Sequence, residues 1–279
     1  RAGARVILCE EDFYPGGRLL AERGAIGDEP GAAWATTAAE ELSSLPNLRI
    51  LLRTTVFGLY DSGTFGAVQR VSDHLAAPDP HTPRQRVWRI VAKRSVLAAG
   101  SIERPLVFGD NDRPGVMLGG AVRTYLNRYA VAPGRRAVVF ATHDDGHRTV
   151  RDLLAAGVAV AALVDPRPEA TAPERVRLVR GVVSRAIGGQ AVRGVEITNA
   201  DGARLRLGCD LLAMSGGWSP TIHLTSHLDS RPRWDEAQAA FVPDKLPAGM
   251  AVAGAASGAF TTAEALSAGA RARTQRLRG

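Results

Sequence analysis

The sequence predicts an α/β protein in which buried parallel strands alternate with helices. Short apolar runs that end in an acidic residue or a small-residue turn are the first observation, at 6–10 and 94–101. The second is the apolar run 137–141, which is followed by a helical pattern and by a further apolar run at 158–164. Strand, turn, helix and strand in this order are typical of Rossmann-like units, so we expect two three-layer units of this kind.

Composition narrows the class of protein. The net charge is +7 over 279 residues, but the basic residues are spread along the chain without a block, which argues against nucleic acid as a partner. No apolar run is long enough to span a bilayer, and no signal peptide is recognisable. Cys9 and Cys209 are isolated and predict buried, reduced thiols. We therefore expect a cytoplasmic protein without a membrane partner.

The first expected strand ends in an acidic residue. In a Rossmann unit the acidic residue that ends the second strand hydrogen-bonds the adenosine ribose, which makes Glu10 a candidate cofactor-binding residue. Gly16 and Gly17 follow, and glycines let the backbone pass close to a ligand. Arg18 either faces a pyrophosphate as a charge-assisted donor or faces solvent.

A helix and an antiparallel unit are expected next. Helical periodicity over 30–45 stops at a Pro-Asn pair. Apolar and alternating runs then predict four strands, at 48–52, 54–60, 66–71 and 86–91. A loop rich in Pro and Asp joins the last two.

The stretch 98–118 is the most informative part of the chain. It opens with the small-residue turn of Ala99, Gly100 and Ser101 at the end of an apolar strand. Open α/β sheets bind their ligands at the carboxyl ends of strands, so these three residues are candidate cofactor contacts. A charged segment and a Pro-Gly turn at 114–115 follow.

The second expected unit has a degenerate nucleotide motif. Its first turn, 141–146, contains two acidic residues and one glycine where a pyrophosphate would need backbone N–H groups and positive potential. We therefore expect vestigial packing there, with a working NAD(P)H site as the alternative. Further expected elements are strands at 176–181, 194–199, 205–210, 211–215 and 251–256 and a helix at 261–273.

These patterns divide the chain into two expected domains. The first comprises 1–132 and 248–279, and the second, 133–247, is inserted into it. A dinucleotide-binding fold begins with a strand, a Gly-rich turn and a helix, and none of them precedes Arg1. We therefore expect the first domain to be truncated at its N-terminus and the chain to be a fragment. No residue pattern indicates a catalytic group or a metal site.

Three motifs carry a resemblance to a known family. They are E-x5-GG from Glu10, GS-x-ER-P with ND-x-PGVML within 98–118, and MSGGW-x-PT at 214–221. Together they resemble the alpha subunits of heterotetrameric sarcosine oxidases, which are two-dinucleotide-binding-domain flavoprotein oxidoreductases. The resemblance implies a segment of a complex that demethylates sarcosine oxidatively and passes the methylene to tetrahydrofolate. Alternatives are a self-contained FAD/NAD(P)H-dependent oxidoreductase and a non-catalytic nucleotide-binding scaffold subunit of an amino-acid or opine oxidase.

The resemblance also implies cofactors and partners. In FAD-binding relatives an Asp follows the glycine of the last strand, whereas here Ala255 follows Gly254. This implies NAD in the FAD-like site, with FAD as the alternative, and the backbone of Val56 beside the adenine. FMN at an interface with a partner subunit, and the beta and smaller subunits of a heterotetramer, are implied as well. The isolated chain is expected to be inactive.

Overall fold

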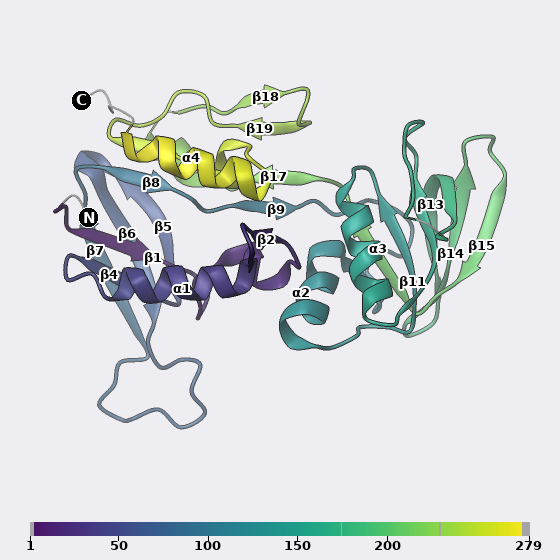
Figure 1. The fold of residues 1–279 in the computed structure, drawn as a ribbon, viewed down its shortest axis with the longest axis horizontal. Coiled ribbons are helices and arrows are strands. Elements are labelled where there is room, and N and C mark those ends of the chain that lie inside the picture. The colour runs from purple at the N-terminus through teal and green to yellow at the C-terminus, as the bar shows by residue number, and fades with distance from the viewer. Residues whose placement is uncertain (1–2, 174, 229, 275–279) are drawn as a thin grey trace.

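The structure, a computed structural model, describes residues 3–173, 175–228 and 230–274. It contains two α/β units joined by extended segments (Figure 1). The unit at the left of the view holds the early and late parts of the chain, and the unit at the right holds the middle part. Among the described residues, no helix has the length and apolar character needed to cross a membrane.

The first unit contains two separate parallel strand pairs. β1 (Val6–Cys9) pairs with β4 (Leu48–Leu51), and β8 (Ser95–Leu97) pairs with β20 (Met250–Val252). The expected helices form as α1 (Gly31–Ser43) and α4 (Thr262–Thr274). The last strand is shorter than expected, because Gly254 turns the backbone to a positive φ and residues Gly254–Ser257 form a 3-10 turn, η4.

An antiparallel sheet follows β4, as expected. It consists of β5 (Thr54–Tyr60), β6 (Thr64–Arg70) and β7 (Gln85–Val91), in that order. The 3-10 turn η2 (Asp61–Gly63) joins the first two strands. The small hairpin of β2 (Ala25–Ile26) and β3 (Glu29–Pro30) and the 3-10 helix η1 (Gly17–Ala21) lie between β1 and α1.

A seven-stranded mixed sheet forms the second unit. Its order is β10-β16-β11-β12-β13-β14-β15, and the strands are parallel as far as β13 and antiparallel beyond it. The bounds are β10 (Val116–Leu118), β11 (Arg136–Ala141), β12 (Ala159–Asp165), β13 (Leu178–Gly188), β14 (Val192–Asn199), β15 (Arg204–Gly208) and β16 (Leu211–Ser215). The strand expected at 176–181 continues to Gly188, because its alternation of buried and exposed side chains persists along the pairing with β14.

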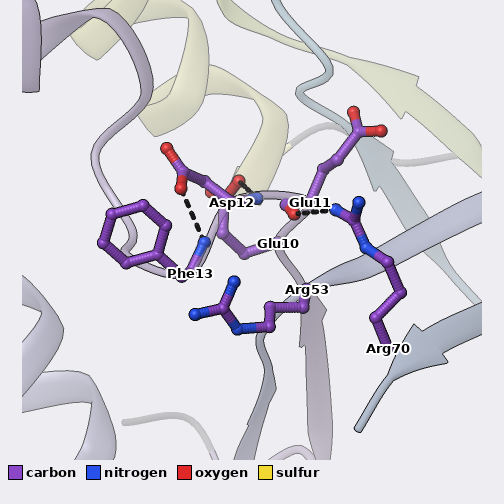
Figure 2. A pocket seen from close by; sticks show the side chains of 6 residues that line it. All are labelled: Glu10, Glu11, Asp12, Phe13, Arg53 and Arg70. Carbon is purple, nitrogen blue, oxygen red and sulfur yellow. Dashed lines mark hydrogen bonds between the residues drawn. The ribbon is translucent and has the colours of Figure 1, made fainter. Parts of the chain in front are cut away.

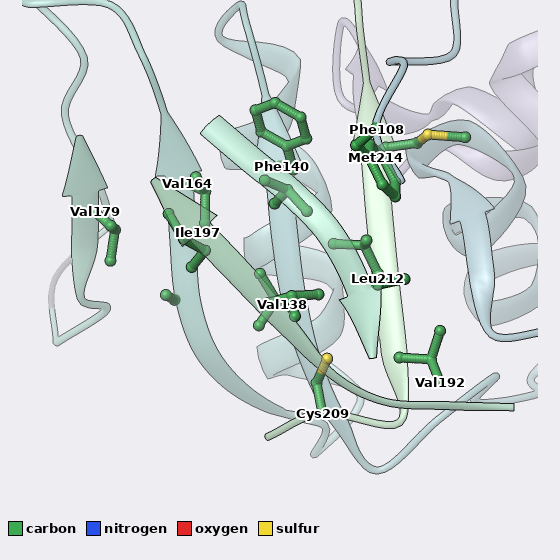
Figure 3. Packing of buried hydrophobic residues seen from close by; sticks show 14 residues of the cluster. Phe108, Val138, Phe140, Val164, Val179, Val192, Ile197, Cys209, Leu212 and Met214 are labelled. Atoms are coloured by element: carbon green, nitrogen blue, oxygen red, sulfur yellow. The ribbon is translucent and has the colours of Figure 1, made fainter. Parts of the chain in front are cut away.

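Side chains on the two faces of this sheet form two cores. Val138, Phe140 and Leu212 face one core, in which β13 and β14 also bury their apolar side chains (Figure 3). Their neighbours Val139 and Leu211 face the other core, against α2 (Gly119–Tyr129) and α3 (Asp145–Ala155). Successive strand residues point to opposite faces, so these runs are apolar throughout.

Short extended segments connect the two units. β9 (Ser101–Glu103) pairs antiparallel with β17 (Trp218–Pro220), and together they carry the chain between the units. The 3-10 helix η3 (His223–Leu228) packs beside β5, and a hairpin of β18 (Arg233–Asp235) and β19 (Ala240–Val242) precedes β20.

Candidate functional site

A cavity of about 370 Å³ lies at the carboxyl end of β1. Six residues line it: Glu10, Glu11, Asp12, Phe13, Arg53 and Arg70. The first four come from the turn after β1, and the two arginines come from the turn after β4 and from the end of β6 (Figure 2). Both parallel strands end at this edge, which is where open α/β sheets bind ligands.

Main-chain and side-chain hydrogen bonds fix Glu10 at this edge. Its N–H donates to the Leu51 carbonyl at 2.9 Å, and its own carbonyl accepts the Thr54 N–H at 2.8 Å. Oε1 accepts the Asp12 N–H at 3.0 Å (Figure 2). These bonds hold the carboxylate in the cavity lining, where its second oxygen can accept hydrogen bonds from a ligand.

The charge of Asp12 is neutralised from within the protein. Arg128 donates to both of its carboxylate oxygens, at 2.6 and 3.3 Å. Partial burial opposes ionisation of Asp12, but these bonds and the Phe13 N–H outweigh it and hold the pKa below its ordinary value of 3.8. The Arg128 and Arg53 guanidinium carbons lie 4.7 and 5.1 Å from the centroid of the Phe13 ring.

The second acidic neighbour of Glu10 is also engaged. The carbonyl of Glu11 accepts a bond from Arg70 at 3.3 Å, and its carboxylate accepts one from the Thr55 hydroxyl at 3.1 Å. Sequence reasoning missed Arg53 and Arg70, because their approach to β1 depends on strand pairing between distant segments.

The four candidate glycines all have a positive φ. Gly16, Gly17, Gly100 and Gly254 have φ values of 139, 52, 72 and 67°. A Cβ at Gly17 or Gly100 would meet nothing within 4 Å, and one at Gly254 would meet a single atom at 3.9 Å. Open space therefore adjoins three of these turns. Gly16 differs, because a Cβ there would come within 2.8 Å of Leu20.

The other candidates lie outside the lining of the Glu10 cavity. Ala99 is exposed, and the buried hydroxyl of Ser101 has no hydrogen-bond partner in the part of the chain that the structure describes. Ala255 is in η4. Val56 is paired with Ala67 on β6.

The structure gives Arg18 a role that its sequence context does not reveal. The guanidinium carbon lies 4.0 Å from the centroid of the Trp218 ring, and Nη2 lies 2.6 Å from Glu22 and 3.6 Å from Asp145. Trp218 and Asp145 belong to β17 and α3, so Arg18 contacts the second unit. Neither sequence expectation, pyrophosphate or solvent, anticipated these contacts.

Polar side chains form hydrogen bonds beside the turn 141–146, which follows β11 of the second unit. Nε2 of His143 lies 2.9 Å from the Ser215 hydroxyl, which donates to Glu103. Glu103 also accepts the Gly120 N–H at 2.6 Å. Burial raises the pKa of Glu103 and lowers that of His143, so burial favours the neutral form of both groups. Sequence reasoning missed Glu103 and Ser215 as partners.

No protein-family model matches the chain, but curated relatives do. The chain is 47% identical over 273 residues to the sarcosine oxidase subunit alpha of Rhizobium meliloti (strain 1021), covering 97% of this chain and 28% of that protein. It is 40% identical over 288 residues to the sarcosine oxidase subunit alpha of Corynebacterium sp. (strain P-1), covering 97% and 30%. The chain thus spans less than a third of the length of these relatives.

Solved structures show the same fold at low sequence identity. The thioredoxin reductase of T. acidophilum matches with a TM-score of 0.69 at 14% identity, over 97% of this chain and 96% of that one. The L-proline dehydrogenase of P. horikoshii matches with a TM-score of 0.68 at 20% identity, over 90% and 45%. This chain is therefore homologous over nearly its whole length to a segment of the sarcosine oxidase alpha subunits and has the fold of FAD/NAD(P)-binding oxidoreductases.

Proposed function

We propose that the chain is the dinucleotide-binding segment of an oxidoreductase subunit that works in the oxidative demethylation of sarcosine. The observation that carries the proposal is Glu10, whose carboxylate lines the cavity at the carboxyl end of β1. A Rossmann unit presents an acidic residue to the adenosine ribose at this place. The names of the relatives supply the substrate class.

The residues around this edge fit the adenosine part of a dinucleotide. A ribose diol donates two hydrogen bonds, and Glu10 offers a carboxylate that is held in place by the Asp12 N–H. The Gly17, Gly100 and Gly254 turns leave room for close approach of a ligand. When bound, a dinucleotide supplies hydride or electron transfer, and this chain's residues bind and orient it.

We propose NAD rather than FAD as the occupant. Ala255 stands where FAD-binding relatives have a carboxylate that anchors the flavin, and its methyl group cannot accept a hydrogen bond. NAD has no ribityl chain and needs no such anchor. The unpartnered Ser101 hydroxyl is the polar group we assign to the remainder of the ligand.

We also propose how the sheet of the first unit is completed. Among the described residues, β1 pairs with β4 and β8 with β20, and neither pair has a third strand. Val6, Ile7 and Val96 on these strands are 44, 44 and 54% exposed. In the Rossmann strand order, the first strand lies between the positions that β1 and β8 occupy. A strand and a glycine-rich turn at these edges would hold the pyrophosphate.

The packing of β10 and α2 supports a proposal for the domain boundaries. β10 pairs with β16, and Val122 and Leu126 of α2 lie in a core of the seven-stranded sheet. We therefore propose that the second unit starts near Val116, earlier than the boundary expected at 132–133, and that it ends near Trp218. The remaining described residues form the first unit.

Partner subunits complete the proposal. The relatives are named as alpha subunits, so we propose that the chain works with a beta subunit and smaller subunits, and that FMN binds at an interface with a partner. Both cysteines are free thiols, which is consistent with the cytoplasmic location we propose.

Ligand titration of matched variants tests the role of Glu10. ADP-ribose and NAD are titrated into the full-length protein that contains this chain, as wild type, as Glu10→Gln and as Glu11→Gln, and binding is followed by equilibrium dialysis. Loss of charge-assisted bonds to the ribose costs about 1.5–3 kcal/mol, or about 10- to 150-fold in Kd. We expect this loss in Glu10→Gln, with Glu11→Gln near wild type. Equal binding by wild type and Glu10→Gln, or no binding by wild type, would refute the proposal.

A further inference from the structure

Arg18 of the first unit contacts the N-terminal end of α3. Arg18 is the second residue of η1, and its guanidinium group lies against the Trp218 ring and beside the Asp145 carboxylate. Only 32% of its side chain is exposed. A guanidinium group held against an aromatic face and between carboxylates has lost most of its freedom to turn toward solvent.

The acceptor side of this contact is built from two elements, α3 of the second unit and the connecting strand β17. Asp145 is the first residue of α3, and its carboxylate accepts the indole N–H of Trp218 at 2.5 Å. Arg148, one turn later, lies 3.3 Å from the same carboxylate. Burial opposes ionisation of Asp145, but the Trp218 N–H and the cations of Arg148 and Arg18 outweigh it and lower its pKa.

Glu22 extends the contact along the unit boundary. Its carboxylate lies 2.6 Å from Arg18, 3.7 Å from Arg123 of α2 and 3.9 Å from Arg148 of α3. Glu22 itself is 13% exposed. One carboxylate of the first unit therefore faces two cations of the second, which makes the boundary complementary in charge.

The same place in a Rossmann-like unit binds a pyrophosphate. The start of the helix after the first strand offers its free N–H groups and the positive end of its dipole to an anion. Here the protein's own Asp145 supplies that negative charge. The His143 ring and the hydroxyl of Ser215 occupy the adjoining strand ends.

We propose that five residues form an intramolecular contact that holds the two units together. We call this cluster the Arg18 seat, and it consists of Arg18, Glu22, Asp145, Arg148 and Trp218. At the nucleotide edge of the second unit the Asp145 carboxylate takes the place of a phosphate and holds Arg18 of the first unit beside it. The second unit binds no nucleotide of its own, and it fixes the Gly16–Gly17 turn through Arg18. The seat is independent of which ligand the first unit binds.

Amide hydrogen exchange with mass spectrometry tests whether the Arg18 seat holds the two units together. In Arg18→Ala we expect the amides of 17–22 and of the first turn of α3 to exchange at least ~10-fold faster, because local opening governs their rates. Peptides of β11 and β16 should be unchanged. Trp218→Phe keeps an aromatic ring for Arg18 but lacks the indole N–H that donates to Asp145, so a smaller increase is expected in the same peptides. Arg84→Ala, at an ion pair with 79% exposure of the arginine, is the matched control.

Three results would overturn the proposal that the Arg18 seat holds the two units together. The first is unchanged exchange at 17–22 in both seat variants. The second is equal acceleration in β11 and β16, which would show a general loss of stability. The third is protection of 141–146 when NADH or NADPH is added to the wild type, since a seat filled by the protein excludes both. If Arg18→Ala does not fold, Trp218→Phe carries the same test.

Discussion

Replacement of Arg123 by Met tests the energy of the buried ion pair between α2 and α3. Arg123 is 5% exposed, and its Nε donates to Asp152 at 3.0 Å. Met keeps an unbranched apolar side chain but removes the charge. The substitution leaves the 9%-exposed side chain of Asp152 and the carboxylate of Glu22 without this cation. A buried carboxylate that loses its partner typically costs 3–5 kcal/mol.

The structure narrows this range. Asn127 still donates to Asp152 at 2.7 Å in the variant, so one charge-assisted bond survives. We therefore expect a loss of about 3 kcal/mol in the free energy of unfolding, measured by urea titration at neutral pH. The exposed pair of Arg84 and Asp73 is the control, and Arg84→Ala should cost less than about 1 kcal/mol.

A second substitution checks the cause. Asp152→Asn in the Arg123→Met background removes the stranded charge and should recover part of the lost stability, because the cost lies in the unpaired carboxylate. A loss below about 1 kcal/mol in Arg123→Met, or a double variant that is less stable than the single one, would refute this reasoning.

Three further predictions concern stability. Leu153→Ala on α3 removes a fully buried side chain, and the free energy of unfolding measured by urea titration should fall by about 2–5 kcal/mol. A fall of less than about 1 kcal/mol would argue against the packing of Leu153 described above. Burial raises the pKa of Glu103 above 4.5, so the protonated form stabilises the fold fully below that pH and this contribution is lost as the pH rises through the raised pKa. Glu103→Gln should remove that fall from a pH series of unfolding measurements, and an unchanged pH profile would contradict it. Burial opposes ionisation of Asp210, but hydrogen bonds from the main-chain N–H groups of Arg136 and Arg135 outweigh it and keep its pKa below 3.8. The contribution of Asp210 to the free energy of unfolding is therefore present above that pH and is lost on acidification. Asp210→Ala should therefore lose about 1.5–3 kcal/mol at neutral pH and progressively less toward pH 2, and a pH-independent loss would contradict the assignment.

Local patterns predicted the elements that build the Glu10 edge. An apolar run that ends in an acid is enough to place a strand and its terminal carboxylate, as β1 shows. Helix α2 was not predicted, because it begins with two glycines and its buried face includes Arg123 beside Val122. A charged residue on the buried face hides the apolar periodicity on which helix prediction depends.

Contacts between distant segments account for what the sequence did not reveal. Arg18 meets Trp218 across 200 positions, and no spacing rule links the two. Arg53 and Arg70 reach the Glu10 cavity through the pairing of β1 with β4 and the fold of the antiparallel sheet. Such neighbours follow from topology, which local periodicity does not encode.

The location of bound nucleotide tests the central claim most directly. The measurement is an experimental structure of the protein with ADP-ribose or NAD, in which the adenosine is placed by its density. The account predicts the adenosine ribose within hydrogen-bond distance of Glu10, beside Phe13 and Arg53, with the turn 141–146 occupied by the protein's own side chains. Adenosine bound at 141–146, or bound elsewhere with Glu10 facing solvent, would contradict it.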